Sequence, residues 1–206
     1  MAFSLDGREL YCGFDTAIEV FEVARPGHEG ERIRTSPNRS SKLGQKGIVS
    51  ALAFAPDYSG VLAAGSFAGT IGLYDTTTAG CPLVKLLRSK TEANGVIKVA
   101  FHPASHLLYS ASRLSDAIEV WDLRNWGKRP GRLARKGKTN QRLGFDVDPS
   151  GEWLVAGDQD GQLSCFSAEY DDQHPAPLAR FQLAQGKQAV QLASRCPAVL
   201  IRASSS

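Results

Sequence analysis

The sequence has 206 residues, of which 42% are hydrophobic and 22% charged, and its formal net charge is +3 at pH 7. This composition is typical of a folded chain that buries one sizeable core or a row of small linked ones, and it argues against disorder throughout. No run approaches the roughly 18 apolar residues of a membrane span. Residues Met1–Gly7 lack the basic region followed by an apolar stretch that marks a secretory signal. We therefore predict a protein that is neither secreted nor membrane-embedded, whose net charge is too small to indicate a partner class.

The four cysteines lie far apart and form no Cys-x-x-Cys pair; they are Cys12, Cys81, Cys165 and Cys196. Cys12 and Cys165 stand inside apolar runs, where a small buried thiol fits. The cysteines are therefore predicted to be structural thiols in a reducing compartment, in preference to disulfides or metal ligands.

Along the chain, a unit of three short apolar segments occurs in four copies, and a fifth copy begins. The first copy is degenerate. Each unit holds β-branched or aromatic stretches separated by Pro, Asp-Gly or Ser-Gly turns, which predicts a small antiparallel meander. No stretch shows a long helical period. The segments are Phe3–Gly7, Leu10–Gly13 and Ala17–Glu22; Gly47–Pro56, Val61–Ser66 and Thr70–Asp75; Gly95–Pro103, Leu107–Ser112 and Ala117–Asp122; Arg142–Gly151, Trp153–Gly157 and Gln162–Phe166; Ala189–Ala193 and Ala198–Ile201.

An aromatic anchor stands at the end of the third segment in each of the four copies. The anchors are Phe21, Tyr74, Trp121 and Phe166. They are 53, 47 and 45 residues apart, at or a little above the roughly 40–45 residues typical of WD repeats. Tyr74-Asp75 and Trp121-Asp122 keep the aromatic-Asp ending of that repeat. No Gly-His dipeptide stands directly before any copy, so the histidine that often joins a buried hydrogen-bond network in this repeat family is absent.

Such a four-stranded sheet cannot bury both of its faces alone, so neighbouring sheets must stack radially. The predicted fold class is therefore all-β, a WD-repeat β-propeller of about four blades plus part of a fifth, in a single region covering residues 1–206. Since seven blades are the most common number in this fold, we expect a fragment of a seven-bladed ring, truncated at its N-terminus. The approximate repeats are 1–24, 47–78, 95–125, 139–169 and 187–206.

The sequence assembles no catalytic or metal-binding constellation. His102 and His106 are four residues apart, but His102-Pro103 is a turn, so the helical geometry that places two ligands on one face is missing. Asp146 and Asp148 could form a carboxylate pair, yet turn and strand-end hydrogen bonding explains them better. Phosphate-binding loops, nucleophile elbows and kinase motifs are also missing. We therefore predict no enzyme activity, no metal, no cofactor and no small-molecule substrate.

Two acid-free basic stretches give the strongest functional signal, and both are interpreted as connections between blades. The candidate RNA-binding residues of the longer stretch are Arg124, Trp126, Lys128, Arg129, Arg132, Arg135, Lys136, Lys138, Asn140, Gln141 and Arg142. The shorter stretch holds Arg32, Arg34, Arg39, Lys42 and Lys46. Cations beside an aromatic ring and amides suit single-stranded or looped RNA, because cations contact phosphates, rings stack on bases and amides read base edges. An acidic protein partner, or a solvated loop without a role, explains the charge almost equally well.

Several segments match one known family in the family's own order, along nearly the whole chain. The longest match is Thr139–Gly151, followed by Leu154–Gly157. The shorter matches are Tyr11–Phe14, Ala24–Gly27, Gly47–Ser50, Gly72–Tyr74 and Trp121–Arg124. In these segments the sequence resembles the telomerase Cajal body protein family of WD-repeat RNA-binding proteins.

The resemblance implies a non-enzymatic scaffold that recognises the Cajal body box in loops of small Cajal body RNAs and telomerase RNA. It also implies residence in nuclear Cajal bodies, a role in telomerase assembly, and the ribonucleoprotein proteins of those particles as partners. For the residues Thr139–Arg142 of the match, the resemblance implies one of two roles, contact with RNA or packing between blades. The alternative interpretation is a WD-repeat scaffold that binds proteins without binding RNA directly.

Overall fold

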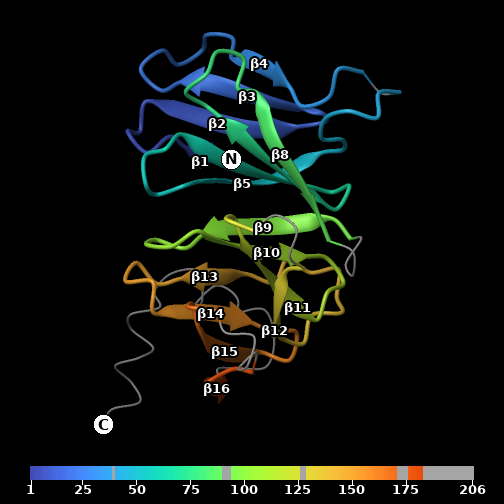
Figure 1. The fold of residues 1–206 in the computed structure, drawn as a ribbon, viewed down its shortest axis with the longest axis vertical. Coiled ribbons are helices and arrows are strands. Elements are labelled where there is room, and N and C mark those ends of the chain that lie inside the picture. Colours follow the sequence, from blue (N-terminus) through green and yellow to red (C-terminus); the bar gives the residue numbers. More distant parts are fainter. Residues whose placement is uncertain (39, 90–93, 126–128, 171–175, 183–206) are drawn as a thin grey trace. The chain divides into compact units, whose positions relative to one another are not determined.

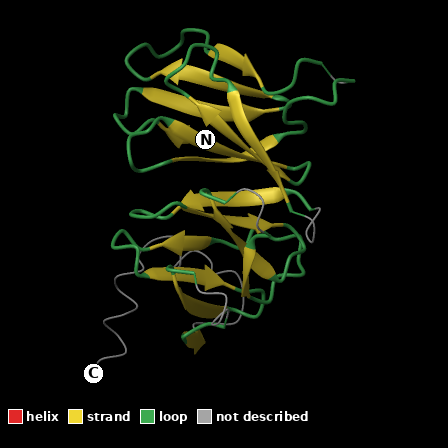
Figure 2. Cartoon of the chain, in the orientation of Figure 1, coloured by secondary structure: helices red, strands yellow, loops and turns green. Residues whose placement is uncertain are grey.

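The computed structural model describes residues 1–38, 40–89, 94–125, 129–170 and 176–182, and every element of secondary structure in them is a β-strand (Figure 2). The strands form antiparallel sheets of four strands each, in which the strands pair in chain order (Figure 1). Within the described ranges, no helical segment has the length and hydropathy that a bilayer crossing requires. The all-β prediction is confirmed.

Each sheet is a meander of four strands that are consecutive along the chain. The first sheet holds β1 (Ala2–Phe3), β2 (Glu9–Phe14), β3 (Ala17–Glu22) and β4 (Glu31–Arg34). The second holds β5 (Val49–Phe54), β6 (Val61–Ser66), β7 (Thr70–Asp75) and β8 (Leu83–Arg88). The third holds β9 (Val96–Phe101), β10 (Leu107–Ser112), β11 (Ala117–Asp122) and β12 (Gly131–Ala134). The fourth holds β13 (Phe145–Val147), β14 (Trp153–Gly157), β15 (Gln162–Ser167) and β16 (Ala179–Gln182).

The chain divides into two compact units, Met1–Phe101 and His102–Ser206, called here the N-terminal and the C-terminal unit. The N-terminal unit holds strands β1 to β9, and the C-terminal unit holds β10 to β16. All three tryptophans, Trp121, Trp126 and Trp153, belong to the C-terminal unit. Tryptophan fluorescence therefore reports on that unit alone.

The anchor aromatics occupy equivalent places in the four sheets, each on the third strand and opposite a leucine of the second strand. The register pairs are Leu10 with Phe21, Leu62 with Tyr74, Leu108 with Trp121, and Leu154 with Phe166. Tyr74, Trp121 and Phe166 are buried, and Phe21 is partly buried. Because the same pair recurs in register, the prediction of four blades is confirmed. The fifth repeat, residues 187–206, lies outside the described residues.

In the N-terminal unit, the first and second sheets share one apolar core. Its buried members are Tyr11, Ile18, Ile33, Val49, Leu62, Ala64, Tyr74 and Cys81. The ring of Tyr11 meets the ring of Phe54 edge to face, with centroids 4.9 Å apart. Facing β-sheets thus bury the inward side chains of both, as the alternation of strand residues requires.

In the C-terminal unit, the third and fourth sheets are joined by Tyr109 of β10. Its hydroxyl donates to the carbonyl of Ala168, and its ring lies 6.5 Å from the ring of Phe145 between centroids. Burial raises the pKa of Tyr109 above its usual value. A further core on the fourth sheet holds Val155, Leu163 and Cys165.

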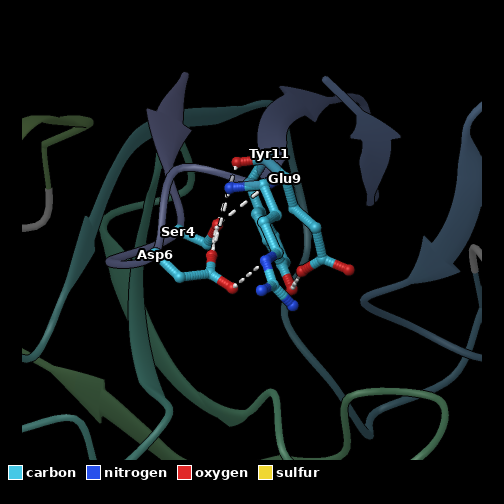
Figure 3. Close-up of polar contacts among 5 residues, drawn as sticks. Ser4, Asp6, Glu9 and Tyr11 are labelled. Atoms are coloured by element: carbon cyan, nitrogen blue, oxygen red, sulfur yellow. Dashed lines mark hydrogen bonds and ion pairs between the residues drawn. The ribbon is translucent and has the colours of Figure 1, made fainter. Parts of the chain in front are cut away.

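The β1–β2 turn shows how side chains close these hairpins (Figure 3). Ser4 Oγ donates to Asp6 Oδ1 at 2.6 Å and accepts from the backbone N of Glu9 at 3.0 Å. Asp6 Oδ1 also accepts from the backbone N of Arg8 at 3.1 Å, and the Ser4 bond is the main reason why the pKa of Asp6 lies below its usual value. Tyr11 donates to Glu9 Oε2 at 2.9 Å. Asp and Ser therefore supply the acceptors that the turn backbone lacks.

The aspartates of the two aromatic-Asp endings hold the turns that follow them. Asp75 Oδ1 accepts from the backbone N of Thr77 at 2.8 Å and from its Oγ1 at 2.6 Å. Asp122 Oδ1 accepts from the backbone N of Arg124 at 2.9 Å. Hydrogen bonds from these neighbours lower the pKa of both carboxyl groups, to about 2 for Asp122, where the Arg124 side chain is the main cause.

The fourth strand of each sheet lies between the sequence repeats, in stretches that the sequence analysis interpreted as connections. For part of both basic stretches that interpretation is wrong, because Arg32 and Arg34 lie on β4 and Arg132 lies on β12. Each of these strands buries a single residue, Ile33 in β4 and Leu133 in β12. One apolar position in four gives no alternation that sequence analysis could detect.

Replacing Trp121 by Phe is expected to lower the free energy of unfolding of the C-terminal unit by about 1–2 kcal/mol. Trp121 Nε1 donates to Ser110 Oγ at 2.9 Å, and both side chains are buried, so the phenyl ring removes the donor and some packed volume. Guanidinium denaturation followed by circular dichroism measures the change. Ser110→Ala is the matched control: it should cost less in the Trp121→Phe background than in the wild type, and equal costs would contradict a stabilising bond.

Candidate nucleic-acid interface

Strand β12 divides the longer basic stretch into two parts that lie at opposite ends of the third sheet. In its antiparallel pairing with β11, Gly131 lies opposite Val120 and Ala134 lies opposite Ala117. Residues 123–130 therefore connect β11 to β12 at one end, and residues 135–144 leave β12 at the other. At about 3.3 Å per residue, roughly 10 Å of strand separates the two parts. The described candidates therefore fall into two groups, one at each end of the sheet, with Arg132 between them.

At the first end, Arg124 and Arg129 are exposed. Arg124 Nη2 lies 3.0 Å from Asp122 Oδ2, and Arg124 Nε donates to Asp122 Oδ1 at 3.1 Å. Because this two-point pair is also the main cause of the low pKa of Asp122, a phosphate that binds Arg124 must compete with that carboxylate. The other candidates of this connection, Trp126 and Lys128, lie outside the described residues.

Between the two ends, Arg132 lies on β12 opposite Glu119 and is partly buried. Its backbone N donates to the hydroxyl of Tyr170 at 3.3 Å. The Tyr170 ring lies against Gly131, where any side chain would collide with it. Arg132 is therefore part of a packed edge strand.

Arg135 is a buried residue, with 5% of its surface exposed. Its Nη1 donates to the carbonyls of Leu143 and Gly144 in its own connection and of Gly157 on β14, at 3.2–3.3 Å. Burial lowers the pKa of Arg135 to about 10, against the opposing effect of Asp158, so the guanidinium stays charged at neutral pH. Since this group is enclosed by carbonyls, we withdraw Arg135 from the RNA-contacting candidates.

Lys136 and Lys138 point to solvent, and each meets an aspartate of a neighbouring turn. Lys136 Nζ lies 2.8 Å from Asp160 Oδ2, and Lys138 Nζ lies 3.1 Å from Asp116 Oδ2. The backbone N of Gly137 and the Lys138 side chain hold the pKa of Asp116 below its usual value, and Asp160 raises the pKa of Lys136. The two lysine side chains are 68% and 76% exposed, so both pairs are weak and open to exchange for another anion.

The next residues of the connection, Asn140, Gln141 and Arg142, are exposed as well. Asn140 Oδ1 accepts from Arg113 Nη2 at 2.9 Å, which brings a cation of the β10–β11 turn to the same end. We call this group the β12–β13 surface. It consists of Arg113, Lys136, Lys138, Asn140, Gln141 and Arg142.

Backbone hydrogen bonds fix the β12–β13 surface to the turns on both sides. Arg135 N donates to the carbonyl of Asp116 at 2.8 Å, and Leu114 N donates to the carbonyl of Thr139 at 3.3 Å. On the other side, Gln159 N donates to the carbonyl of Lys136 at 3.1 Å. A connection held in this way loses little conformational freedom when it binds a ligand.

Sequence reasoning missed Arg113, which belongs to this surface, and Asp116 and Asp160, which pair with its lysines. They lie in the β10–β11 and β14–β15 turns, far along the chain from the basic stretch, so no local pattern links them to it. Asp116 and Asp160 also offset part of the positive charge that the acid-free stretch predicts. The surface can thus offer exchangeable cations and amide groups to a polyanion.

His102 has a structural role. Ala104 N donates to His102 Nδ1 at 3.0 Å, so Nε2 carries the hydrogen and donates to the carbonyl of Gly151 at 2.9 Å. Ser150 N donates to Asp148 Oδ2 at 3.2 Å, which agrees with the turn explanation of that carboxylate. Among the described residues, no three His, Cys, Asp or Glu side chains gather closely enough to hold a metal ion.

The described cysteines are free thiols: Cys81 and Cys165 are buried and Cys12 is partly buried. Burial raises the pKa of Cys81 to about 11 and also raises the pKa of Cys165. These two thiols therefore stay protonated at neutral pH and behave as small apolar side chains. Cys196 lies outside the described residues.

Comparison with known proteins gives the chain a family, although no protein-family model matches it. Over 184 residues it is 38% identical to telomerase Cajal body protein 1 of Mus musculus, an alignment that covers 88% of this chain and 33% of the mouse protein. It is 36% identical over 183 residues to telomerase Cajal body protein 1 of Homo sapiens, covering 88% of this chain and 32% of the human protein. The chain belongs to the telomerase Cajal body protein family. It spans about a third of the length of these relatives.

A relative with a different name is guanine nucleotide-binding protein negative regulator 1 of Schizosaccharomyces pombe. The two chains are 32% identical over 169 residues, which cover 79% of this chain and 41% of the yeast protein. In this chain, which is a member of the telomerase Cajal body protein family, the Thr139–Gly151 segment runs along the β12–β13 surface and then forms β13. Leu143 and Phe145 are buried, whereas Gln141 and Arg142 are exposed, so one segment supplies both packing and surface.

Proposed function

We propose that this chain is a non-enzymatic RNA-binding scaffold for small Cajal body RNAs and telomerase RNA. Its further partners are the proteins of those ribonucleoproteins, its place is the Cajal body of the nucleus, and it supports telomerase assembly. The β12–β13 surface, in a chain whose mouse and human relatives are named for telomerase and the Cajal body, carries the proposal. Because the chain spans about a third of those relatives, the proposal concerns the surface that this chain itself contains.

Binding uses the exposed cations and the amides in different ways. Lys136 and Lys138 exchange their aspartate partners for phosphate oxygens, and each phosphate contact steepens the dependence of log affinity on log salt by roughly 0.7 for a single strand. Asn140 and Gln141 offer amide groups to base edges, which are accessible in unpaired loops and closed off in a duplex. The surface therefore favours looped RNA over double-stranded RNA.

The double variant Lys136→Glu and Lys138→Glu is expected to bind a hairpin loop of a small Cajal body RNA at least about tenfold more weakly than the wild type. Its salt dependence should be shallower, by roughly 0.7 for each phosphate that the variant no longer binds. Fluorescence anisotropy with a labelled hairpin, repeated at several salt concentrations, measures both quantities. Unchanged tryptophan fluorescence verifies that the C-terminal unit has kept its fold.

The matched control is Arg8→Glu with Arg25→Glu. Like the two lysines, these arginines are exposed and each lies beside a carboxylate, Asp6 and Glu22. The control changes net charge by the same amount, so it should keep the affinity within about twofold if direct phosphate binding decides the affinity. An equal weakening in both double variants would show that only total charge matters, and the proposed surface would then be rejected.

A protein-binding scaffold without direct RNA contact is the second candidate. The aspartate partners of Lys136 and Lys138 favour it, because they offset the field that would attract a polyanion. It predicts co-purified proteins that survive nuclease treatment, and no binding of the labelled hairpin by the purified chain.

A further inference from the structure

The N-terminal unit has a basic connection in the place equivalent to that of the β12–β13 surface. It runs between β4 and β5 (Figure 1), from the fourth strand of one sheet to the first strand of the next. Gln45 and Lys46 precede β5 by the same numbers of residues as Gln141 and Arg142 precede β13. The shorter basic stretch of the sequence, which the proposed function does not use, thus lies at the matching end of its own sheets.

Among the described residues, two cations of this connection lack the ion pairs that Lys136 and Lys138 form on the β12–β13 surface. Arg34 and Lys42 are exposed, and no ion pair joins either of them to another residue in the described part of the chain. Lys46 is partly exposed. Asp15, in the β2–β3 turn, lies at this same end of the first sheet, bridged through its backbone to Ile48. Arg34 and Lys42 therefore offer two exposed cations to a polyanion.

Apolar side chains are exposed among these cations. Leu43 is 73% exposed, Ile48 48% and Phe67 42%. Phe67 N donates to the carbonyl of Ile48 at 2.9 Å, so the two residues lie on adjacent backbones. Both the backbone and one edge of the ring of Phe67 lie against Gly95, where a Cβ would come within 2.9 Å of the Phe67 Cα and of its Cδ1. The ring of Phe67 is thus presented from a fixed backbone.

Buried hydrogen bonds hold the connection in shape. Gln45 is fully buried, and its Nε2 donates to the carbonyls of Ala64 and Thr70 at 2.7 and 3.1 Å. Thr35 Oγ1 donates to the carbonyl of Gln45 at 2.8 Å. Ser66 Oγ donates to the carbonyl of Lys46. The exposed side chains therefore sit on a scaffold already ordered for binding.

We propose that this end of the N-terminal unit is a second RNA-contacting surface, on which an unpaired base stacks on Phe67 beside Ile48 while Arg34, Lys42 and Lys46 contact the flanking phosphates. The inference rests on the proposed function and adds base stacking, which the described residues of the β12–β13 surface do not offer. A few partly exposed apolar side chains fall far short of the roughly 800 Å² per partner of a stable protein interface, whereas one ring between cations suits a single strand.

The test uses the full chain and a fluorescein-labelled single-stranded RNA of twelve mixed nucleotides as the probe. Phe67→Leu keeps an apolar side chain but removes the ring, and should weaken binding about tenfold, the scale of one base-aromatic stack. Phe67→Trp should bind as well as the wild type or better. Lys42→Glu should weaken binding and make its salt dependence shallower by roughly 0.7. Arg8→Glu, at the opposite end of the first sheet, is the control and should change little.

The outcomes separate this inference from the proposed function. Normal binding by Phe67→Leu and Lys42→Glu, together with weak binding by the Lys136 and Lys138 double variant, overturns the second surface and keeps the proposed function. A wild-type chain that binds no RNA overturns both. Loss of binding to a poly-glutamate probe in Phe67→Leu and Lys42→Glu, with RNA binding unchanged, overturns the inference in favour of an acidic protein partner.

Discussion

Replacing Arg135 by Met is expected to lower the free energy of unfolding of the C-terminal unit by about 3–5 kcal/mol, the cost of breaking a buried charged network. Methionine keeps the apolar stem but removes the donors to the carbonyls of Leu143, Gly144 and Gly157. The Gly144 carbonyl keeps the backbone N of Gly157 as a donor, but a buried carbonyl left without a donor costs roughly 1–3 kcal/mol, and Asp158 loses a nearby cation. Denaturation followed by tryptophan fluorescence measures the effect, since every tryptophan lies in this unit.

Lys136→Met is the matched control, because it removes the neighbouring charge from an exposed side chain and should change stability by less than about 0.5 kcal/mol. For RNA affinity the expected order is reversed, so that the Lys136 variant is affected and the Arg135 variant is not. At a temperature where both variants are folded, Lys136→Met should weaken hairpin binding and Arg135→Met should not. A stable Arg135→Met chain that no longer binds RNA would return Arg135 to the RNA-contacting surface.

The alternation of burial along this segment shows what the sequence could have revealed. Leu133, Arg135 and Gly137 are buried, whereas Lys136 and Lys138 are exposed, so the period of two continues past the end of β12. Arg135 lies two residues after Leu133 and therefore on the same, buried face, and this spacing could have predicted its burial from the sequence. Charge density alone, which sums over both faces, could not distinguish Arg135 from Lys136.

The parts of the fold that sequence reasoning predicted are those that bury pairs of apolar residues. Trp121 and Leu108 face each other across β10 and β11, and the same pair recurs in the other sheets, so aromatic spacing was enough to count the blades. Strands β4 and β12 escaped because Ile33 and Leu133 are their only buried residues. Their backbone hydrogen bonds to β3 and β11 define them, and such bonds leave no mark in the sequence.

The ion pairs of the candidate surface were beyond prediction for a different reason. Lys136 meets Asp160 and Lys138 meets Asp116, and the partners of both pairs are more than twenty residues apart in sequence. Only the folding of the C-terminal unit brings these turns together. A stretch without acidic residues therefore need not form a surface without acidic residues.

Gln45 takes part in a buried hydrogen-bond network. In the repeat family a histidine often joins a network of this kind, and that histidine is absent from this sequence. Gln45 lies before β5, is fully buried, and accepts from the hydroxyl of the anchor Tyr74 at 2.9 Å while donating to the carbonyls of Ala64 and Thr70. A side-chain amide can both accept and donate, as a neutral imidazole does. The loss of the Gly-His signature thus removes a sequence marker without removing the network that ties the β4–β5 connection to β6 and β7.

Replacing Gln45 by Leu is expected to lower the free energy of unfolding of the N-terminal unit by about 3–4 kcal/mol, because two buried carbonyls and one buried hydroxyl each lose a hydrogen bond to the amide. Hydrogen exchange measures the change directly: amides of β5, β6 and β7 should exchange faster, while those of β10, β11 and β15 should not change. Tyr74→Phe alone removes one donor and should cost about 1 kcal/mol, and it should cost less in the Gln45→Leu background, where its partner is already gone. If Tyr74→Phe costs the same in both backgrounds, Tyr74 and Gln45 are not coupled, and another group must hold the β4–β5 connection.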